Sequence, residues 1–357
     1  MLEKGERAAG VSLVQTIGLS LAPTDCRCHL EDTHNHTVFV MRYFIGKLHQ
    51  SADMEVPETY FQRVMSAWLV VSTLQMLELK FHIVIQAYRS FESDLFSLGL
   101  DRFLGRKFDR SLVAEIYIRT NQQVLALLTA ARAYHDQRPQ DLARISAQGK
   151  PYREWADREF RRVFDASLDY RVMEALRNYA QHHQLPIDAF SFAGQRVETD
   201  VGISALRYTV DPKFNLKSLI ENRKTRKKTS AEIEELGLDW IDAKHAVRGY
   251  IEGLVEGHNG VRRIVRDEFF RSRVCIEQAV QDFIESSGGK EDGRLVHAYA
   301  FDGNSILQEQ YLGLDVINNV EEMQALLSGS KSFSSSFIST EVARQHESHP
   351  AVASKRK

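Results

Sequence analysis

Apolar residues recur at a three-to-four-residue step along three long runs of this chain, at residues 57–99, 111–137 and 151–183. That step places the apolar side chains on one face of an α-helix. Pro186 cannot continue a helix, and it biases Leu185 away from helical backbone angles. The sequence therefore predicts a mainly helical fold built on three long helices, the last of which ends shortly before Pro186.

The pattern divides the 357 residues into four segments. Residues 1–55 contain short runs typical of strands, and residues 56–188 are expected to form the bundle of long helices, in which Pro139 helps to close the second helix. Residues 189–327 are expected to form a smaller α+β part. Residues 328–357 are rich in serine and charged residues, which predicts a disordered tail.

Within the third segment, strand-like and helical patterns alternate. Residues 203–210 alternate like a strand, and Asp211-Pro212 is expected to turn the chain. A helical run extends from residue 240 to residue 280, and Gly257 and Gly260 could divide it into two helices.

Composition narrows the possible functions. The chain has 46 Lys and Arg against 48 Asp and Glu, a net charge of −2, so any RNA-binding surface must be a local patch. Three cysteines are too few and too scattered for a disulfide framework, which predicts a cytoplasmic protein. The most apolar stretch, residues 67–77, is shorter than the ~18 residues that span a membrane, so no membrane segment is expected.

Two cysteines and three histidines gather near the N-terminus as potential zinc ligands: Cys26, Cys28, His29, His34 and His36. Their Cys-x-Cys spacing is less usual than Cys-x2-Cys, and no second ligand pair follows at the distance found in zinc fingers. A polar hairpin loop is therefore the preferred interpretation, and no metal or other cofactor is predicted.

Polar residues suited to phosphate chemistry lie at the end of the third predicted helix. Asn178 and His182 are four residues apart and share one face, whereas Arg177 lies about 140° from His182 around the axis. Histidine titrates near neutrality, arginine presents a fork that suits phosphate, and Asn178 can fix the imidazole tautomer. Together they could move the proton of an RNA 2′-hydroxyl and stabilise a charged phosphorane without a metal. The simpler interpretation is that the helix dipole favours basic residues in a last turn.

Further basic residues could bind the RNA backbone. Arg171 could bind phosphate or pair with Glu174 or Asp165 on the helix surface. A basic cluster follows in the third segment and includes Lys224, Arg226, Lys227 and Lys228. This cluster is expected either to follow a phosphate backbone or to form a solvated linker, and Thr229 or Ser230 is expected to cap the next helix.

Tyr134-His135-Asp136 lies near the predicted end of the second helix. A solvated helix terminus is the preferred interpretation. The alternative is that these residues join the Arg177 and His182 site across a dimer.

The string Arg177-Asn178-x-x-x-His182 resembles the Arg-x4-6-His motif of HEPN domains, including the asparagine that their ribonuclease members often carry. A longer string, from Tyr170-Arg171 to Leu185-Pro186, resembles a set of uncharacterised bacterial proteins. The resemblance covers about residues 56–188. It implies a helical bundle that forms a homodimer and is a metal-independent endoribonuclease of toxin–antitoxin, abortive-infection or other antiviral systems. Some members of the family only bind.

Two functions follow from these expectations. In the first, His182 is the general base that activates the 2′-hydroxyl, Arg177 stabilises the phosphorane, and Asn178 orients the imidazole; RNA is the substrate, and an antitoxin or defence protein is a possible partner. In the second, the chain is a non-catalytic helical binding or scaffold module, and the same three residues hold the helix end against the segment that follows.

Overall fold

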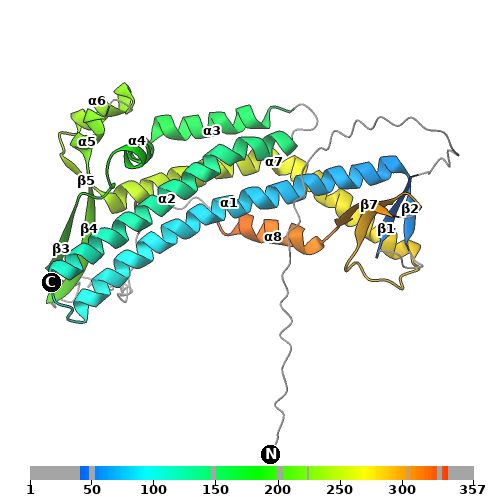
Figure 1. Ribbon diagram of the computed structural model, residues 1–357, viewed down its shortest axis with the longest axis horizontal. Helices are drawn as coiled ribbons and strands as arrows, with labels where there is room; N and C mark the ends of the chain where they lie inside the picture. Colours follow the sequence, from blue (N-terminus) through cyan, green and yellow to red (C-terminus); the bar gives the residue numbers. More distant parts are fainter. Residues whose placement is uncertain are drawn as a thin grey trace, which may run out of the picture. The chain divides into compact units, whose positions relative to one another are not determined.

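The computed structural model describes residues 41–47, 53–145, 150–198, 204–222, 225–303, 305–327 and 332–336, all within the compact unit Met41–Lys357. The described part is mainly helical, as the sequence predicts, with two small antiparallel sheets (Figure 1). The helices are α1 (Glu58–Phe103), α2 (Arg110–Ile145), α3 (Tyr152–Ala166), α4 (Leu168–His182), α5 (Leu216–Glu221), α6 (Lys227–Glu235), α7 (Ala243–Ser286) and α8 (Leu314–Ala325). The strands are β1 (Arg42–Gly46), β2 (Met54–Val56), β3 (Ala189–Glu198), β4 (Ser204–Asn215), β5 (Trp240–Asp242), β6 (His297–Phe301) and β7 (Ile306–Tyr311).

Helix α1 is the central element of the core. Its 46 residues give it a length of about 70 Å, and α2, α7 and α8 all pack along it (Figure 1). The first helix predicted from the sequence is therefore confirmed, although it continues past Gly99 to Phe103. Buried aromatic residues of α1, such as Phe61, Phe81 and Phe91, form much of the core.

Helix α2 is longer than predicted, because it continues through Pro139 to Ile145. A proline inside a helix removes one backbone hydrogen bond. The turns beyond it are held by Leu142, which is fully buried, and by an ion pair of 2.7 Å between Asp141 Oδ2 and Lys80 Nζ of α1. Tertiary contacts thus offset the helix-breaking tendency of this proline.

The third predicted helix is two helices, α3 and α4, which meet at Ser167. Ser167 has extended backbone angles, and its hydroxyl oxygen accepts a 3.2 Å hydrogen bond from the backbone N–H of Tyr170. This N-cap starts α4 as a separate helix. The periodic pattern of apolar residues continues across the break, so the sequence does not reveal it. The predicted end before Pro186 is confirmed, since α4 ends at His182.

Helix α7 is continuous over 44 residues, so Gly257 and Gly260 do not divide it. Gly257 and Gly260 instead permit close packing against α3, and Gly253 permits close packing against α4. A Cβ atom on Gly257 would lie 2.5 Å from the ring of Phe160, and one on Gly253 would lie 2.6 Å from the ring of Tyr170. Any larger residue at these positions would push α7 away from its neighbours.

The two sheets have the strand orders β2-β1-β6-β7 and β3-β4-β5. Because β1 pairs with β6, and α7 packs along α1, α3 and α4, the residues from Met41 onward form one compact unit. No separation occurs at the expected boundaries after residues 55 and 188. Asp211-Pro212 does not turn the chain, because β4 continues through it; Pro212 lies just outside the pairing of residues 213–215 with β5.

Two further expectations concern membranes and the tail. Among the described helices, α1 is long and apolar enough to cross a membrane, and half of its most apolar 18-residue window is buried inside the fold. The prediction of a disordered tail is wrong for residues 332–336. The backbone N–H and the hydroxyl of Ser334 both donate to Glu252 of α7, and the ring of Phe333 packs edge-on against Tyr88 of α1.

Candidate functional site at the end of helix α4

Arg177 is an internal residue that takes part in joining α4 to α7. Its Nη1 lies 2.9 Å from Glu174 Oε2, and its Nη2 donates a 2.9 Å hydrogen bond to Asn178 Oδ1. The other oxygen of Glu174 accepts a 2.7 Å hydrogen bond from the hydroxyl of Tyr250, a fully buried residue of α7. Only 11% of the Arg177 side chain is exposed. Its positive charge is therefore directed at a carboxylate of the protein.

His182 lies in a different environment. It is exposed in the last turn of α4, and within the described part of the chain its ring forms no hydrogen bond or ion pair. Among the described residues, no hydrogen bond joins Asn178 to this imidazole; the side-chain oxygen of Asn178 accepts from Arg177. A single copy of the chain therefore does not bring the Arg177 and His182 side chains onto one substrate, in agreement with their separation of about 140° around the helix.

Another residue, Asn121 of α2, holds the segment after α4. Its side chain donates to the carbonyl of Ile187 at 3.2 Å and accepts from the N–H of the same residue at 2.9 Å. Both residues are buried. The sequence gives no indication of this role, because an asparagine in the middle of a helical run resembles any other polar position.

His135 is not at a solvated helix terminus, because α2 continues for ten more residues. Its Nε2 lies 2.8 Å from the hydroxyl oxygen of Tyr170 in α4, and Arg138 Nη1 lies 3.2 Å from its Nδ1. A guanidinium can only donate, so Nδ1 accepts and the Nε2–H donates to Tyr170. Burial, together with the smaller effect of the positive charges of Arg138, Arg177 and Arg132, lowers the pKa of His135 to about 3, so this ring is neutral at pH 7.

A second polar cluster lies deeper in the core, where α1, α2 and α7 meet. His258 Nε2 lies 3.0 Å from Glu78 Oε2, and His258 Nδ1 lies 2.7 Å from the hydroxyl of Tyr134. Arg262 donates to both oxygens of Glu78, at 2.9 and 2.6 Å. Burial alone would raise the pKa of Glu78, but His258 and Arg262 more than offset this effect and lower it. All four groups have partners, and none offers an opening for a substrate.

The expected RNA-binding residues are in differing environments. Arg171 is buried; it binds Glu232 of α6 and the carbonyl oxygens of Phe164 and Asp165 at the end of α3. Of the two interpretations of Arg171, pairing with an acidic residue is the one that its contacts match, although the partner is Glu232 rather than Glu174 or Asp165.

The basic cluster lies at the start of α6. Arg226, Lys227 and Lys228 are exposed, and the guanidinium of Arg226 lies 4.4 Å from the centre of the Phe164 ring. Lys224 lies outside the described residues. Helix α6 begins at Lys227 after Arg226, so neither Thr229 nor Ser230 caps it.

The zinc hypothesis falls on residues 26–36, which lie outside the described ranges. Among the residues that are described, no three or more His, Cys, Asp or Glu side chains gather in a way that could hold a metal ion.

Comparisons of the chain with models of protein families, with curated proteins and with solved structures give no match. The interpretation of the site therefore depends on its own geometry.

Proposed function

We propose that this chain is a non-catalytic helical binding module, in which the Arg177 and Asn178 pair is a structural element. The observation that supports this proposal most directly is the Glu174–Arg177 ion pair, with Glu174 also bound to Tyr250 of α7. An arginine that stabilises a phosphorane needs its guanidinium free to face the substrate. Here one carboxylate and one amide already occupy two of its nitrogens, and the side chain is mostly buried.

The role of His182 in this proposal differs from the one expected from the sequence. The segment after α4 is held by Asn121, which binds the backbone of Ile187, and His182 is exposed. The structural role therefore belongs to Arg177 and Asn121, and His182 is free to be replaced without effect on the fold.

The second candidate function is the metal-independent endoribonuclease, favoured by the exposure of His182 and of the basic residues Lys227 and Lys228. In this alternative the protein is cytoplasmic and forms a homodimer. A second copy then supplies the positively charged side chain that does not reach the substrate of His182 within one chain. His182 removes the 2′-hydroxyl proton, and the products carry a 2′,3′-cyclic phosphate and a 5′-hydroxyl. A toxin or antiviral role, with a restraining partner, belongs to this alternative only.

Incubation of the purified protein with total RNA in EDTA separates the two functions. The binding module leaves the RNA intact. The enzyme cuts it, produces cyclic phosphate ends, and loses this activity in His182→Ala but not in Gln181→Ala, a matched change at the neighbouring exposed position. Cleavage in EDTA that depends on His182 would refute the binding module.

A further inference from the structure

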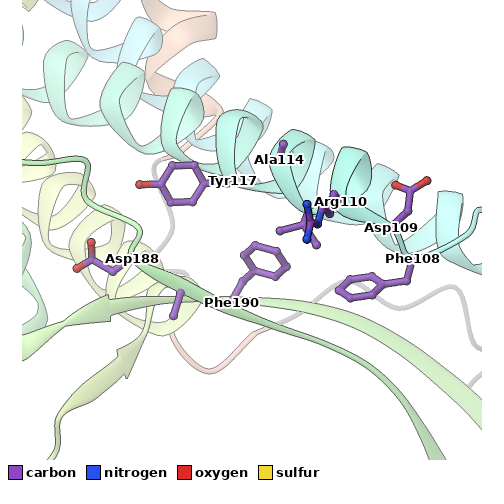
Figure 2. Close-up of a pocket in the computed structure, with 9 residues that line it drawn as sticks. Phe108, Asp109, Arg110, Ala114, Tyr117, Asp188 and Phe190 are labelled. Carbon is purple, nitrogen blue, oxygen red and sulfur yellow. The ribbon is translucent and has the colours of Figure 1, made fainter.

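A groove in the described part of the chain has no part in the chemistry considered so far. It lies between the start of α2 and the start of β3 and has a volume of about 890 Å³. Figure 2 shows the ring of Phe190 directed from β3 toward the helix, with Ala114 and Tyr117 on the facing side. Apolar clefts with a few polar groups are the usual form of binding sites.

The groove carries charges of opposite sign on its two sides. In Figure 2 Asp188 lies at one end of the labelled residues, and Arg110 lies toward the other end, next to Asp109, whose carboxylate accepts a 2.9 Å hydrogen bond from the backbone N–H of Leu112. Neither Arg110 nor Asp188 forms an ion pair with any residue that the structure describes, and burial raises the pKa of Asp188. A partner that matches this surface therefore has a carboxylate at one end, a cation at the other and apolar side chains between them.

One wall of the groove is an edge strand. β3 pairs only with β4 in the sheet order β3-β4-β5, and its first residues, Ala189 and Phe190, line the groove. The outer backbone edge of β3 therefore has N–H and C=O groups with no neighbouring strand in the described part of the chain. An extended peptide can add to such an edge and place alternate side chains in adjacent pockets.

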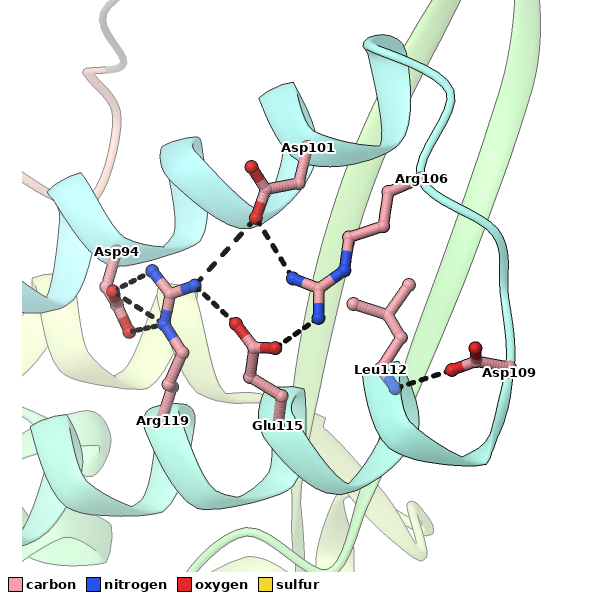
Figure 3. A network of polar contacts seen from close by, with 7 residues as sticks. All are labelled: Asp94, Asp101, Arg106, Asp109, Leu112, Glu115 and Arg119. Atoms are coloured by element: carbon pink, nitrogen blue, oxygen red, sulfur yellow. Dashed lines mark hydrogen bonds and ion pairs between the residues drawn. The ribbon is translucent and has the colours of Figure 1, made fainter.

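The opposite wall is held rigidly. Where α2 faces α1, Arg119 of α2 donates to Asp94 of α1 at 3.0 Å and to Glu115 at 3.0 Å (Figure 3). Arg106, in the turn between the two helices, contacts both Asp101 and Glu115. This network joins α1 to α2 and holds the start of α2, which is one wall of the groove, in place.

From these features we infer that the groove binds an extended peptide segment of a partner protein, which adds as a strand to the edge of β3. Its alternate side chains are apolar and contact Phe108, Ala114 and Phe190, while its two ends carry a carboxylate near Arg110 and a cation near Asp188. This inference rests on the proposed function as a binding module and names the chemistry of the partner.

The test uses the full chain and short fluorescent peptides that alternate valine or phenylalanine with threonine. Three peptides differ only at their ends: one lysine and one glutamate, two lysines, or two glutamates. Fluorescence anisotropy should show saturable binding of the mixed peptide by the wild type. Ala114→Arg fills the groove at an exposed helix position and should weaken binding at least about tenfold. Ala133→Arg, at an exposed position of the same helix outside the groove, is the matched control and should bind like the wild type.

The charges give an independent check. Asp188→Lys replaces a negative charge of the groove by a positive one, so this variant should prefer the peptide with two glutamates over the mixed one.

Failure of the wild type to bind the mixed peptide, or equal binding by Ala114→Arg, would overturn the inference. A dimer detected by light scattering that Ala114→Arg dissociates, without peptide binding, would also overturn it and assign the groove to a second copy. The RNA assay is a separate measurement, so failure of the groove and failure of the proposed function can be distinguished.

Discussion

His258 and His182 lie near opposite extremes of environment in this protein. His258 is fully buried in α7, and both ring nitrogens have partners, Glu78 and Tyr134. His182 is exposed at the end of α4, with no polar partner among the described residues. The sequence patterns single out His182 and give no reason to select His258. The histidine with a polar partner on each ring nitrogen is therefore the one that the motif does not contain.

The free energy of unfolding that a polar residue contributes therefore depends on whether its removal leaves its partners buried and unpaired or exposed to water. Replacing a partner of His258 leaves charged groups buried without compensation. Replacing His182 leaves only water in its place.

Glu78→Ala should cause the largest loss of stability, about 3–5 kcal/mol, because Arg262 and His258 then lose their shared carboxylate in the core. Chemical denaturation followed by circular dichroism measures this loss. Glu78→Gln keeps the shape and part of the hydrogen bonding, so it should be less destabilising. A loss below about 1 kcal/mol for Glu78→Ala, the range of an exposed ion pair, would show that the cluster does not hold the core together.

Arg177→Ala should have an intermediate effect, a loss of about 1–3 kcal/mol, because Glu174 remains bound to Tyr250 without its counter-ion. Arg177→Lys keeps the positive charge but cannot donate to Glu174 and Asn178 with the same planar fork, so it should recover only part of the stability. The same denaturation measurement applies. Wild-type stability in Arg177→Ala would contradict the structural role on which the proposed function depends.

Acid should destabilise the protein in part through His135. The folded pKa of about 3 lies below the ordinary value of 6.5, so the unfolded chain binds a proton that the folded chain rejects. The stabilisation is complete above pH 6.5 and is lost as the pH falls toward 3. The charged or titratable groups that face this ring are Arg132 and Arg138 from α2 and Tyr170 and Arg177 from α4.

His135→Gln can keep the hydrogen bonds to Arg138 and Tyr170 but does not titrate. Stability measured at about pH 7 and about pH 5 should therefore fall less in this variant, by about 1–2 kcal/mol. His258, whose pKa burial also lowers, remains in the variant and keeps part of the slope. An unchanged slope would show that His135 is protonated as readily in the folded chain as in the unfolded one.

The three-to-four-residue spacing of apolar residues predicted the long helices correctly because packing in the core requires this spacing. Each turn of α1 that faces α2 or α7 needs an apolar residue. The boundaries of the helices depended on single contacts. Lys80 and Asp141, which are 61 residues apart, extend α2 past Pro139, and local propensity cannot reveal this pair. The hydroxyl of Ser167 is a local cap that separates α3 from α4, but the apolar pattern continues across it without a break.

The candidate site shows the same limit. Spacing along a helix correctly placed Arg177 and His182 on different sides of α4, but it could not show which charges meet across helices. The partner of Arg171 is Glu232, sixty-one residues away, and Tyr250, which binds Glu174, is seventy-six residues from it. Such pairs are fixed by the packing of α4 against α6 and α7, which no short string encodes.

His182→Ala should have the smallest effect on stability, within about 0.5 kcal/mol of the wild type, because the ring is exposed and makes no polar contact with the described residues. Because the stability of this variant is expected to be unchanged, any change in its RNA cleavage or peptide binding cannot be attributed to unfolding. His182→Ala should leave peptide binding unchanged if the groove and the end of α4 act separately. A loss of stability near that of Arg177→Ala would mean that His182 is held by a contact outside the described residues, and the contrast with His258 would no longer be valid.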